Sequence, residues 1–132
     1  MADTVASTTI QDGERTSVLR FTNVSDGTGE SEVVKVDASA LAAMTSGSKS
    51  TNLKIMRCWW SISGMDVDML FDASTNILAL SLTSDGAGYL DFTSFGGLPN
   101  TAGSGKTGDI LFTTRNHTSG DTYTIILEVQ KG

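Results

Sequence analysis

The chain has 132 residues and a formal net charge of −6, from 9 basic and 15 acidic residues. This length indicates one domain, large enough to bury a core without disulfides or a structural metal. The acidic balance disfavours direct binding to nucleic-acid phosphates or to anionic membranes. No uncharged apolar run is long enough to cross a bilayer as a helix.

The single cysteine, Cys58, has no partner for an internal disulfide. The sequence therefore gives no sign of folding in an oxidising compartment. The first residues of the chain carry neither the basic nor the apolar region of a secretory signal. Together these features favour a soluble protein made in the cytoplasm.

Short strand-like segments separated by turn residues run through the chain. Segments rich in Val, Ile, Leu, Phe, Thr and Tyr alternate with Gly, Asp, Asn and Ser clusters such as residues 26–29 and 119–121. In chain order, the pattern predicts eight strands at residues 14–25, 32–37, 52–63, 66–72, 77–83, 89–95, 109–114 and 122–130. Residues 38–44 are the only good helix-forming stretch and predict about two helical turns.

The alternation within each strand predicts which side chains face the core. The most regular inward stripe is in the last strand, at Tyr123, Ile125, Leu127 and Val129. The other predicted same-face sets are Leu19 with Phe21; Val34 with Val36; Met56, Cys58, Trp60 and Ile62, opposite Ile55, Arg57 and Trp59; Val67, Met69 and Phe71; Leu78, Leu80 and Leu82; and Leu90 with Phe92.

The N-terminal residues differ in composition from the rest of the chain. Residues 1–9 are small and polar, with only Val5 of any bulk. We therefore expect residues 1–12 to form an extended, flexible arm that orders only when a neighbour holds it. Residues 13–132 then form a single domain. The predicted fold class is all-β, an antiparallel β-sandwich with a jelly-roll-like topology.

One glycine-rich segment resembles the end of a phosphate-binding loop. Residues 103–107 read Gly-Ser-Gly-Lys-Thr, but Asn100 stands where that loop requires glycine. A strand follows at residues 109–114, where phosphate binding requires the N-terminus of a helix. The segment is therefore interpreted as a surface loop, within a longer Gly-rich loop at residues 96–108.

Acidic and histidine residues offer little support for a metal or catalytic site. Asp66, Asp68 and Asp72 share one face of a predicted strand and could contribute to a Ca²⁺ site, but the offsets lack the Gly and Glu of an EF-hand. An acidic outer face that keeps the strand soluble is the favoured interpretation. His117, the only histidine, is predicted to lie in a hairpin loop, with no nucleophile elbow in the chain. No cofactor, metal site or enzymatic activity is predicted.

Two adjacent tryptophans must point to opposite faces of their strand. One of Trp59 and Trp60 is therefore expected in the core. The other packs beneath a loop or the short helix, or is exposed. An exposed tryptophan on a sheet is typical of a protein interface or a sugar-stacking platform.

Several segments of the chain resemble small virion proteins of tailed bacteriophages. The resemblance lies in residues 20–31 (RFTNVSDGTGES), 33–37 (VVKVD), 59–65 (WWSISGM), 90–92 (LDF), 95–100 (FGGLPN), 108–114 (GDILFTT) and 117–128 (HTSGDTYTIILE). It covers most of the chain after residue 9 and includes no catalytic motif.

This resemblance implies a virion structural protein, most similar to capsid decoration (cement) proteins. Such a protein is made in the host cytoplasm, binds the major capsid protein on the outer capsid surface, and stabilises capsomer junctions. A homo-oligomer is expected, with a trimer favoured, and neither nucleic acid nor membrane as a partner. The alternatives are a tail-fibre or baseplate module and a carbohydrate-binding module for host attachment. The predicted interface residues are Val5, Thr9, Ile10, Trp59, Trp60, Leu98, Pro99 and Asn100.

Overall fold

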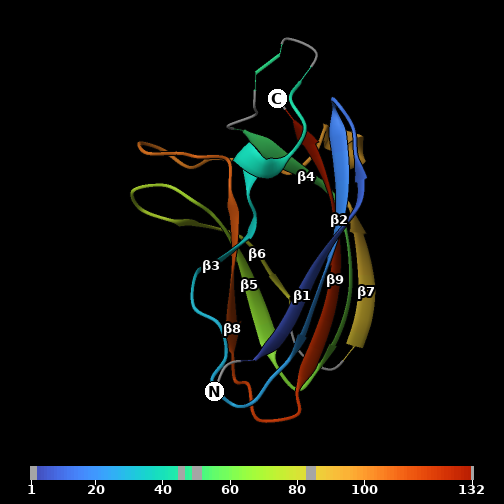
Figure 1. Ribbon diagram of the computed structural model, residues 1–132, viewed down its shortest axis with the longest axis vertical. Coiled ribbons are helices and arrows are strands. Elements are labelled where there is room, and N and C mark those ends of the chain that lie inside the picture. The colour runs from blue at the N-terminus through green and yellow to red at the C-terminus, as the bar shows by residue number, and fades with distance from the viewer. Residues whose placement is uncertain (1–2, 45–46, 49–51, 83–85, 132) are drawn as a thin grey trace.

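The computed structural model describes residues 3–44, 47–48, 52–82 and 86–131, which form two antiparallel sheets packed face to face (Figure 1). The five-stranded sheet has the order β1-β2-β9-β4-β7, and the four-stranded sheet has the order β3-β8-β5-β6. The strands are β1 (Thr4–Asp12), β2 (Thr16–Val24), β3 (Val33–Val36), β4 (Leu53–Ser63), β5 (Asp66–Phe71), β6 (Ile77–Leu82), β7 (Gly86–Asp91), β8 (Ile110–Arg115) and β9 (Thr122–Lys131).

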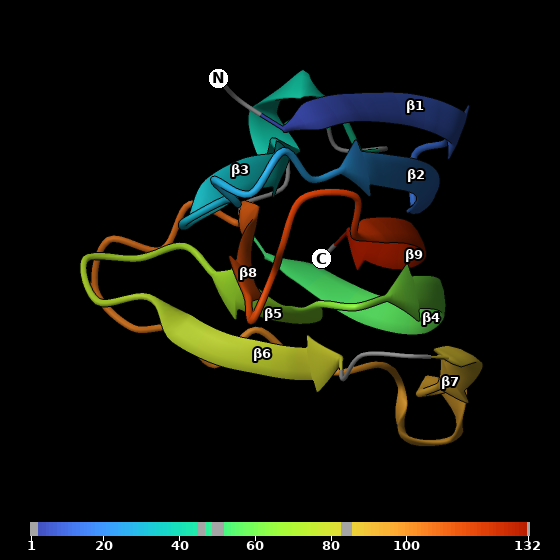
Figure 2. The ribbon, with the colours of Figure 1, turned by 90° about the horizontal axis from the view of Figure 1, so that it is seen from below.

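The topology is that of a jelly roll with one additional strand. Without β1, the two sheets have the orders β2-β9-β4-β7 and β3-β8-β5-β6, which form an eight-stranded jelly roll of two Greek keys. The view along the sandwich shows the two layers, with β1 beyond β2 at one edge (Figure 2). The predicted all-β, jelly-roll-like sandwich is confirmed, and the eight predicted strands overlap β2–β9. The strand predicted at residues 89–95 is wrong in its second half, because β7 ends at Asp91 and a 3₁₀ turn, η2 (Thr93–Phe95), follows. Residue 83, the predicted end of one strand, lies outside the described residues.

The core lies between the sheets and is organised around β9. Tyr123, Ile125, Leu127 and Val129 are each 1% exposed or less, so the predicted inward stripe is confirmed. Phe112 of the opposite sheet packs edge-on against Tyr123, with ring centroids 5.9 Å apart. It also packs edge-on against Phe21 of β2, at 5.3 Å. The aromatic contacts therefore join the two layers across the core.

A β-bulge in β4 reverses the predicted face of two residues. The pairing with β9 shifts between Ile55 and Arg57, so Met56 is an extra residue on the β4 side. Leu53 and Ile55 are fully buried before the bulge, and Cys58 is fully buried after it. The prediction that Met56 shares a face with Cys58, opposite Ile55, is therefore wrong, because strict alternation fails at a bulge.

The same cause corrects the predicted faces in two shorter strands. The β5–β6 register shifts between Met69 and Leu70, and Leu78 is 57% exposed rather than buried with Leu82. In β3 the register shifts after Val34, which is 48% exposed although Val36 is fully buried. The inward prediction for Leu90 is also wrong, because this residue is exposed on the edge strand β7.

The predicted helix at residues 38–44 is reduced to a single 3₁₀ turn, η1 (Ala38–Ala40). Asp37 caps this turn, and Leu41 has extended backbone angles and a buried side chain. The amide of Ala42 donates a 2.8 Å hydrogen bond to Asp12. Tertiary contacts thus hold residues 41 and 42 outside a helix and override their helical propensity.

The N-terminal residues form an edge strand in place of the predicted unpaired arm. Strand β1 pairs with β2 from Thr4 opposite Val24 to Asp12 opposite Ser17. All nine of its side chains are exposed, so backbone pairing rather than burial holds it. The absence of an apolar face, which motivated the arm, is thus compatible with a strand. Residues 1 and 2 of the predicted arm lie outside the described residues.

Polar anchors fix both ends of β1. At its C-terminal end, the fully buried Lys131 Nζ donates to Asp12 Oδ1 at 2.8 Å and to the carbonyl oxygens of Gly13 and Ala42. At its N-terminal end, Asp3 accepts hydrogen bonds from Asn23 Nδ2 at 3.1 Å and from the amides of Asp26 and Gly29. The last described residue of the chain therefore anchors the hairpin that contains the first described strand.

We expect Leu127→Ala to lower the free energy of unfolding by about 2–5 kcal/mol, because a fully buried leucine is replaced by a cavity. Urea unfolding monitored by circular dichroism measures this change. Leu78→Ala is the matched control, because Leu78 is 57% exposed, and a small loss is expected there. Equal losses in the two variants would contradict the assignment of β9 to the core.

We expect Asp12→Asn to destabilise the protein more at neutral than at acidic pH. Burial raises the pKa of Asp12, but hydrogen bonds from Lys131, Ser17 and Ala42 outweigh it and hold that pKa below its ordinary 3.8. A carboxyl with a lowered pKa contributes stability above its ordinary pKa, and this contribution is lost as the pH falls through the folded-state pKa. Urea unfolding at about pH 7 and about pH 2.5 tests this, and an equal effect at both values would contradict it.

Candidate interaction surface

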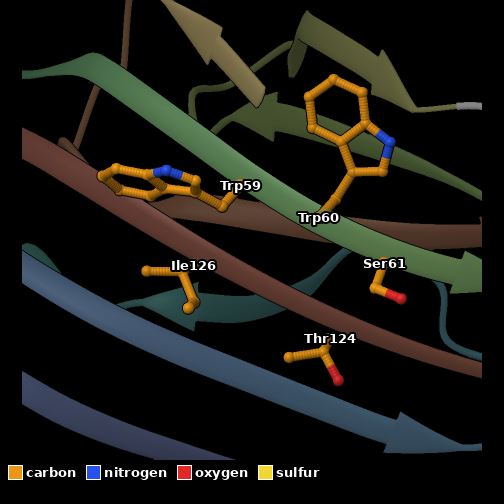
Figure 3. A pocket seen from close by; sticks show the side chains of 5 residues that line it. All are labelled: Trp59, Trp60, Ser61, Thr124 and Ile126. Carbon is orange, nitrogen blue, oxygen red and sulfur yellow. The ribbon is translucent and has the colours of Figure 1, made fainter. Parts of the chain in front are cut away.

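The outer face of the five-stranded sheet carries an aromatic pair. Trp59 and Trp60 point to opposite sides of β4 (Figure 3). Trp59 lies on the outer face, opposite Tyr89 of β7. The two rings stack with centroids 5.2 Å apart and an interplanar angle of 21°. Tyr89 is 46% exposed, so this stack is open to solvent.

Trp60 is the inward member of the pair. It packs against the core cluster, and it lies opposite Gly88 in the β4–β7 ladder. A Cβ atom at position 88 would lie 2.4 Å from the Trp60 ring, so only glycine allows this close approach. Trp60 is one of the predicted interface residues, but its ring is directed between the sheets.

A shallow depression of about 180 Å³ lies beside Trp59 on the outer face. The pairing of β4 with β9 builds it, because Trp59 lies opposite Ile126 and Ser61 lies opposite Thr124. Trp59 and Ile126 supply apolar walls, and Ser61 and Thr124 lie at the margin with their hydroxyl oxygens directed away from the indole of Trp59 (Figure 3). The depression can take a small flat apolar group against the indole.

Arg57 forms ion pairs with two carboxylates at one end of this face. Arg57 Nη1 donates to Glu128 Oε2 at 3.0 Å, and Arg57 Nε lies 3.7 Å from Asp91 Oδ2. The side-chain and backbone hydrogen bonds from Thr93, with smaller contributions from Tyr89 and Arg57, lower the pKa of Asp91 to about 2. One guanidinium between two carboxylates leaves a single net negative charge beside the aromatic pair, and contact with this face depends mainly on its apolar area.

Sequence reasoning did not single out Tyr89, Ile126 or Thr124. The outward direction of Ile126 and Thr124 follows from the stripe on β9, since they alternate with buried residues. Their position beside Trp59 requires the β4–β9 pairing. The Trp59–Tyr89 stack likewise requires the pairing of β4 with β7, and no local spacing encodes it.

The three predicted interface residues of β1 are all exposed. Val5 and Ile10 are 48% and 54% exposed, and Thr9 lies between them on the same edge strand. They are separated from the Trp59 depression, which β4 and β9 form, by β2. The structure therefore places the predicted residues on two different surfaces.

The predicted loop residues are divided between core and surface. Leu98 forms an isolated β-bridge with Ile55, with backbone hydrogen bonds of 2.8 and 3.1 Å, and its side chain packs against the core. Pro99 is exposed, and Asn100 Oδ1 accepts a 2.9 Å hydrogen bond from the amide of Ala102. Of these three residues, Pro99 is the one most accessible to a partner.

The carboxylates considered as metal ligands accept hydrogen bonds from other side chains of the chain. Asp68 accepts hydrogen bonds from Arg115 Nε at 2.7 Å and Arg115 Nη2 at 2.9 Å, and Asp72 accepts one from Thr107 Oγ1 at 2.7 Å. Residues 103–107 lie in a loop that leads into β8. His117 lies in the β8–β9 connection, close to Gly29. This connection is not the predicted hairpin, because β8 and β9 belong to different sheets.

Over the described ranges, no group of three or more His, Cys, Asp or Glu side chains is placed to hold a metal ion. Cys58 is fully buried, and desolvation raises the pKa of its thiol to about 12. Such a thiol remains protonated at neutral pH and is a poor nucleophile. In the part of the chain that the structure describes, no helix is both long and apolar enough to span a membrane.

Comparisons with known proteins return little. No family model matches the chain, and no curated protein matches it. A solved structure of a cupin superfamily protein from Desulfitobacterium hafniense aligns over 99% of this chain and 80% of its own, with 11% sequence identity and a TM-score of 0.35.

We expect the two tryptophans to differ in their contribution to stability. Trp60→Ala removes a ring packed against the core and should lower the free energy of unfolding by about 3 kcal/mol. Trp59→Ala removes an outer-face stack and should lower it by about 1 kcal/mol. Urea unfolding of both variants measures the difference, and a larger loss for Trp59→Ala would contradict the assignment of faces.

Proposed function

We propose that this protein is a structural component of a tailed-phage virion, and that it binds the outer surface of the capsid as a decoration protein. The partner is the major capsid protein, and the bound state is a homo-oligomer, with the trimer favoured by the resemblance. The resemblance of residues 20–31 and 108–128 to small virion proteins supports this assignment. The jelly roll is compatible with it, but this fold also hosts many other functions.

The observation that carries the proposal is the exposed Trp59–Tyr89 stack on the outer face. Stable protein interfaces are enriched in aromatic anchors at their centre, and a depression beside Trp59 can receive a side chain of the partner. Because Arg57 is ion-paired with Asp91 and Glu128, this group carries only a single net negative charge and adds little attraction to a charged partner. Binding through this face should therefore depend weakly on salt.

The proposal is tested by binding of the purified protein to expanded capsids that lack it, measured by co-sedimentation. The native protein should remain bound at about 0.5 M NaCl, where electrostatic attraction is screened. Trp59→Ala should weaken binding by about tenfold or more, as expected for the loss of an interface anchor. Leu78→Ala, at a side chain 57% exposed on β6 of the four-stranded sheet, is the matched control and should bind normally.

Two outcomes would contradict this assignment. Release of the native protein at that salt concentration would show that electrostatic contacts dominate, and normal binding of Trp59→Ala would remove the outer face from the interface. Electron microscopy of virions that contain the protein tests its location directly. Density on the head supports decoration, whereas density on the tail would favour a tail-fibre or baseplate module.

A carbohydrate-binding module is the second candidate, and the indole of Trp59 on the outer face favours it. An indole beside the apolar side chain of Ile126 suits the apolar face of a sugar ring. Titration with host surface glycans should then change tryptophan fluorescence in the native protein and not in Trp59→Ala. An unchanged spectrum in the native protein at millimolar glycan would reject this candidate.

A further inference from the structure

Strand β1 leaves one edge of the five-stranded sheet open (Figure 2). Its other edge pairs with β2 along the whole strand. Within residues 3–44, 47–48, 52–82 and 86–131, no strand pairs with the open edge. Such an edge presents backbone donors and acceptors that can pair with a strand of another chain.

The part of β1 before its bulge at Ile10 lacks the features that usually protect an edge. Residues 4–11 read Thr-Val-Ala-Ser-Thr-Thr-Ile-Gln, without charge or proline and with several β-branched residues. The register with β2 is regular from Thr4 to Thr9 and shifts only after that. This part of β1 is therefore a regular, uncharged strand with a high propensity for pairing.

The other three sheet edges are less suited to pairing. Strand β3 has four residues and a register shift, and β6 has a register shift near its middle. Strand β7 contains Gly86 and Gly88 and ends at Asp91. Glycine weakens a strand, and bulges and charges discourage edge contacts. Strand β1 is therefore the edge of the described sheets that best fits an intermolecular contact.

The ends of β1 hold it in place for such a contact. Asp12 is bound by Lys131, and Asp3 by Asn23 and by the amides of Asp26 and Gly29. These contacts position the strand before any partner arrives, so pairing costs little additional ordering. They also engage the two carboxylates that flank the uncharged run.

We propose that β1 pairs antiparallel with β1 of a second copy of this chain, about a two-fold axis at Ser7. In this register, Val5 lies opposite Thr9, Ala6 lies opposite Thr8, and Ser7 lies opposite its own copy. An isologous contact requires a self-complementary surface, and small, uncharged side chains are compatible in both directions of the strand. The lack of charge also matters because two chains of net charge −6 repel each other elsewhere.

The contact joins the two five-stranded sheets into one continuous sheet. It goes beyond the capsid-binding role, because it forms between free copies in solution and gives a dimer there. The trimer implied by the resemblance concerns the capsid-bound state. The test therefore uses the free full-length protein, and its result is independent of whether capsid binding is found.

Cysteine cross-linking tests the two-fold register. Ser7→Cys should form a disulfide-linked dimer under mild oxidation, because the two introduced thiols face each other across the axis. Ala87→Cys, at an exposed position on the opposite edge strand β7, is the matched control and should remain largely monomeric on a non-reducing gel. Cys58 does not interfere because it is fully buried. Equal cross-linking of both variants would overturn the proposal.

Sedimentation equilibrium tests the contact without a new covalent bond. The native protein should show a reversible monomer–dimer equilibrium. Ser7→Lys places two like charges opposite each other and should weaken dimerisation by about tenfold or more, whereas Ala87→Lys adds the same charge at the other edge and should not. Monomeric native protein at all concentrations, or equal effects of the two lysines, would overturn the proposal.

Discussion

The pairing of β9 with two neighbours is the constraint on which the rest of the structure depends. It is the last strand in the sequence, and it lies between β2 and β4 at the centre of the five-stranded sheet. Its inward residues, Tyr123 to Val129, form the middle of the core. Because side chains alternate along a strand, the same pairing places Thr124 and Ile126 on the outer face beside Trp59. One strand thus organises both the core and the candidate interaction surface.

Buried polar contacts extend the influence of β9 to both ends of the sandwich. At one end, Lys131 holds the β1–β2 hairpin and residue 42. At the other, Tyr123 Oη donates a 2.7 Å hydrogen bond to Glu30, which also forms a buried ion pair with Lys35. Burial, with the nearby Glu30 carboxylate, raises the pKa of Tyr123. Removing Tyr123 Oη or the Lys35 ammonium group should lower the free energy of unfolding, because the Glu30 carboxylate would stay buried without that partner.

The surface of the molecule carries two candidate contact regions. The acidic side chains that share one strand face are engaged by Arg115 and Thr107, and the one cysteine is buried. The outer face offers an open aromatic pair, and β1 offers an uncharged edge. These two surfaces use different physical interactions, namely apolar burial and backbone hydrogen bonding. A protein that assembles with other chains can use both at once, because β2 and β9 separate them.

The sequence by itself determined the fold class, the eight jelly-roll strands and the inward stripe of β9, because these depend on local alternation and turn residues. Only the tertiary structure decided where that alternation fails. The bulge at Met56 places Ile55 in the core, and the contact of Ala42 with Asp12 shortens the helix. Likewise, β1 became a strand because β2 offered an edge, and Trp59 lies on the outer face because Trp60, opposite Gly88, is directed inward. In each case the deciding contact joins residues distant in sequence, and local pattern carries no information about such contacts.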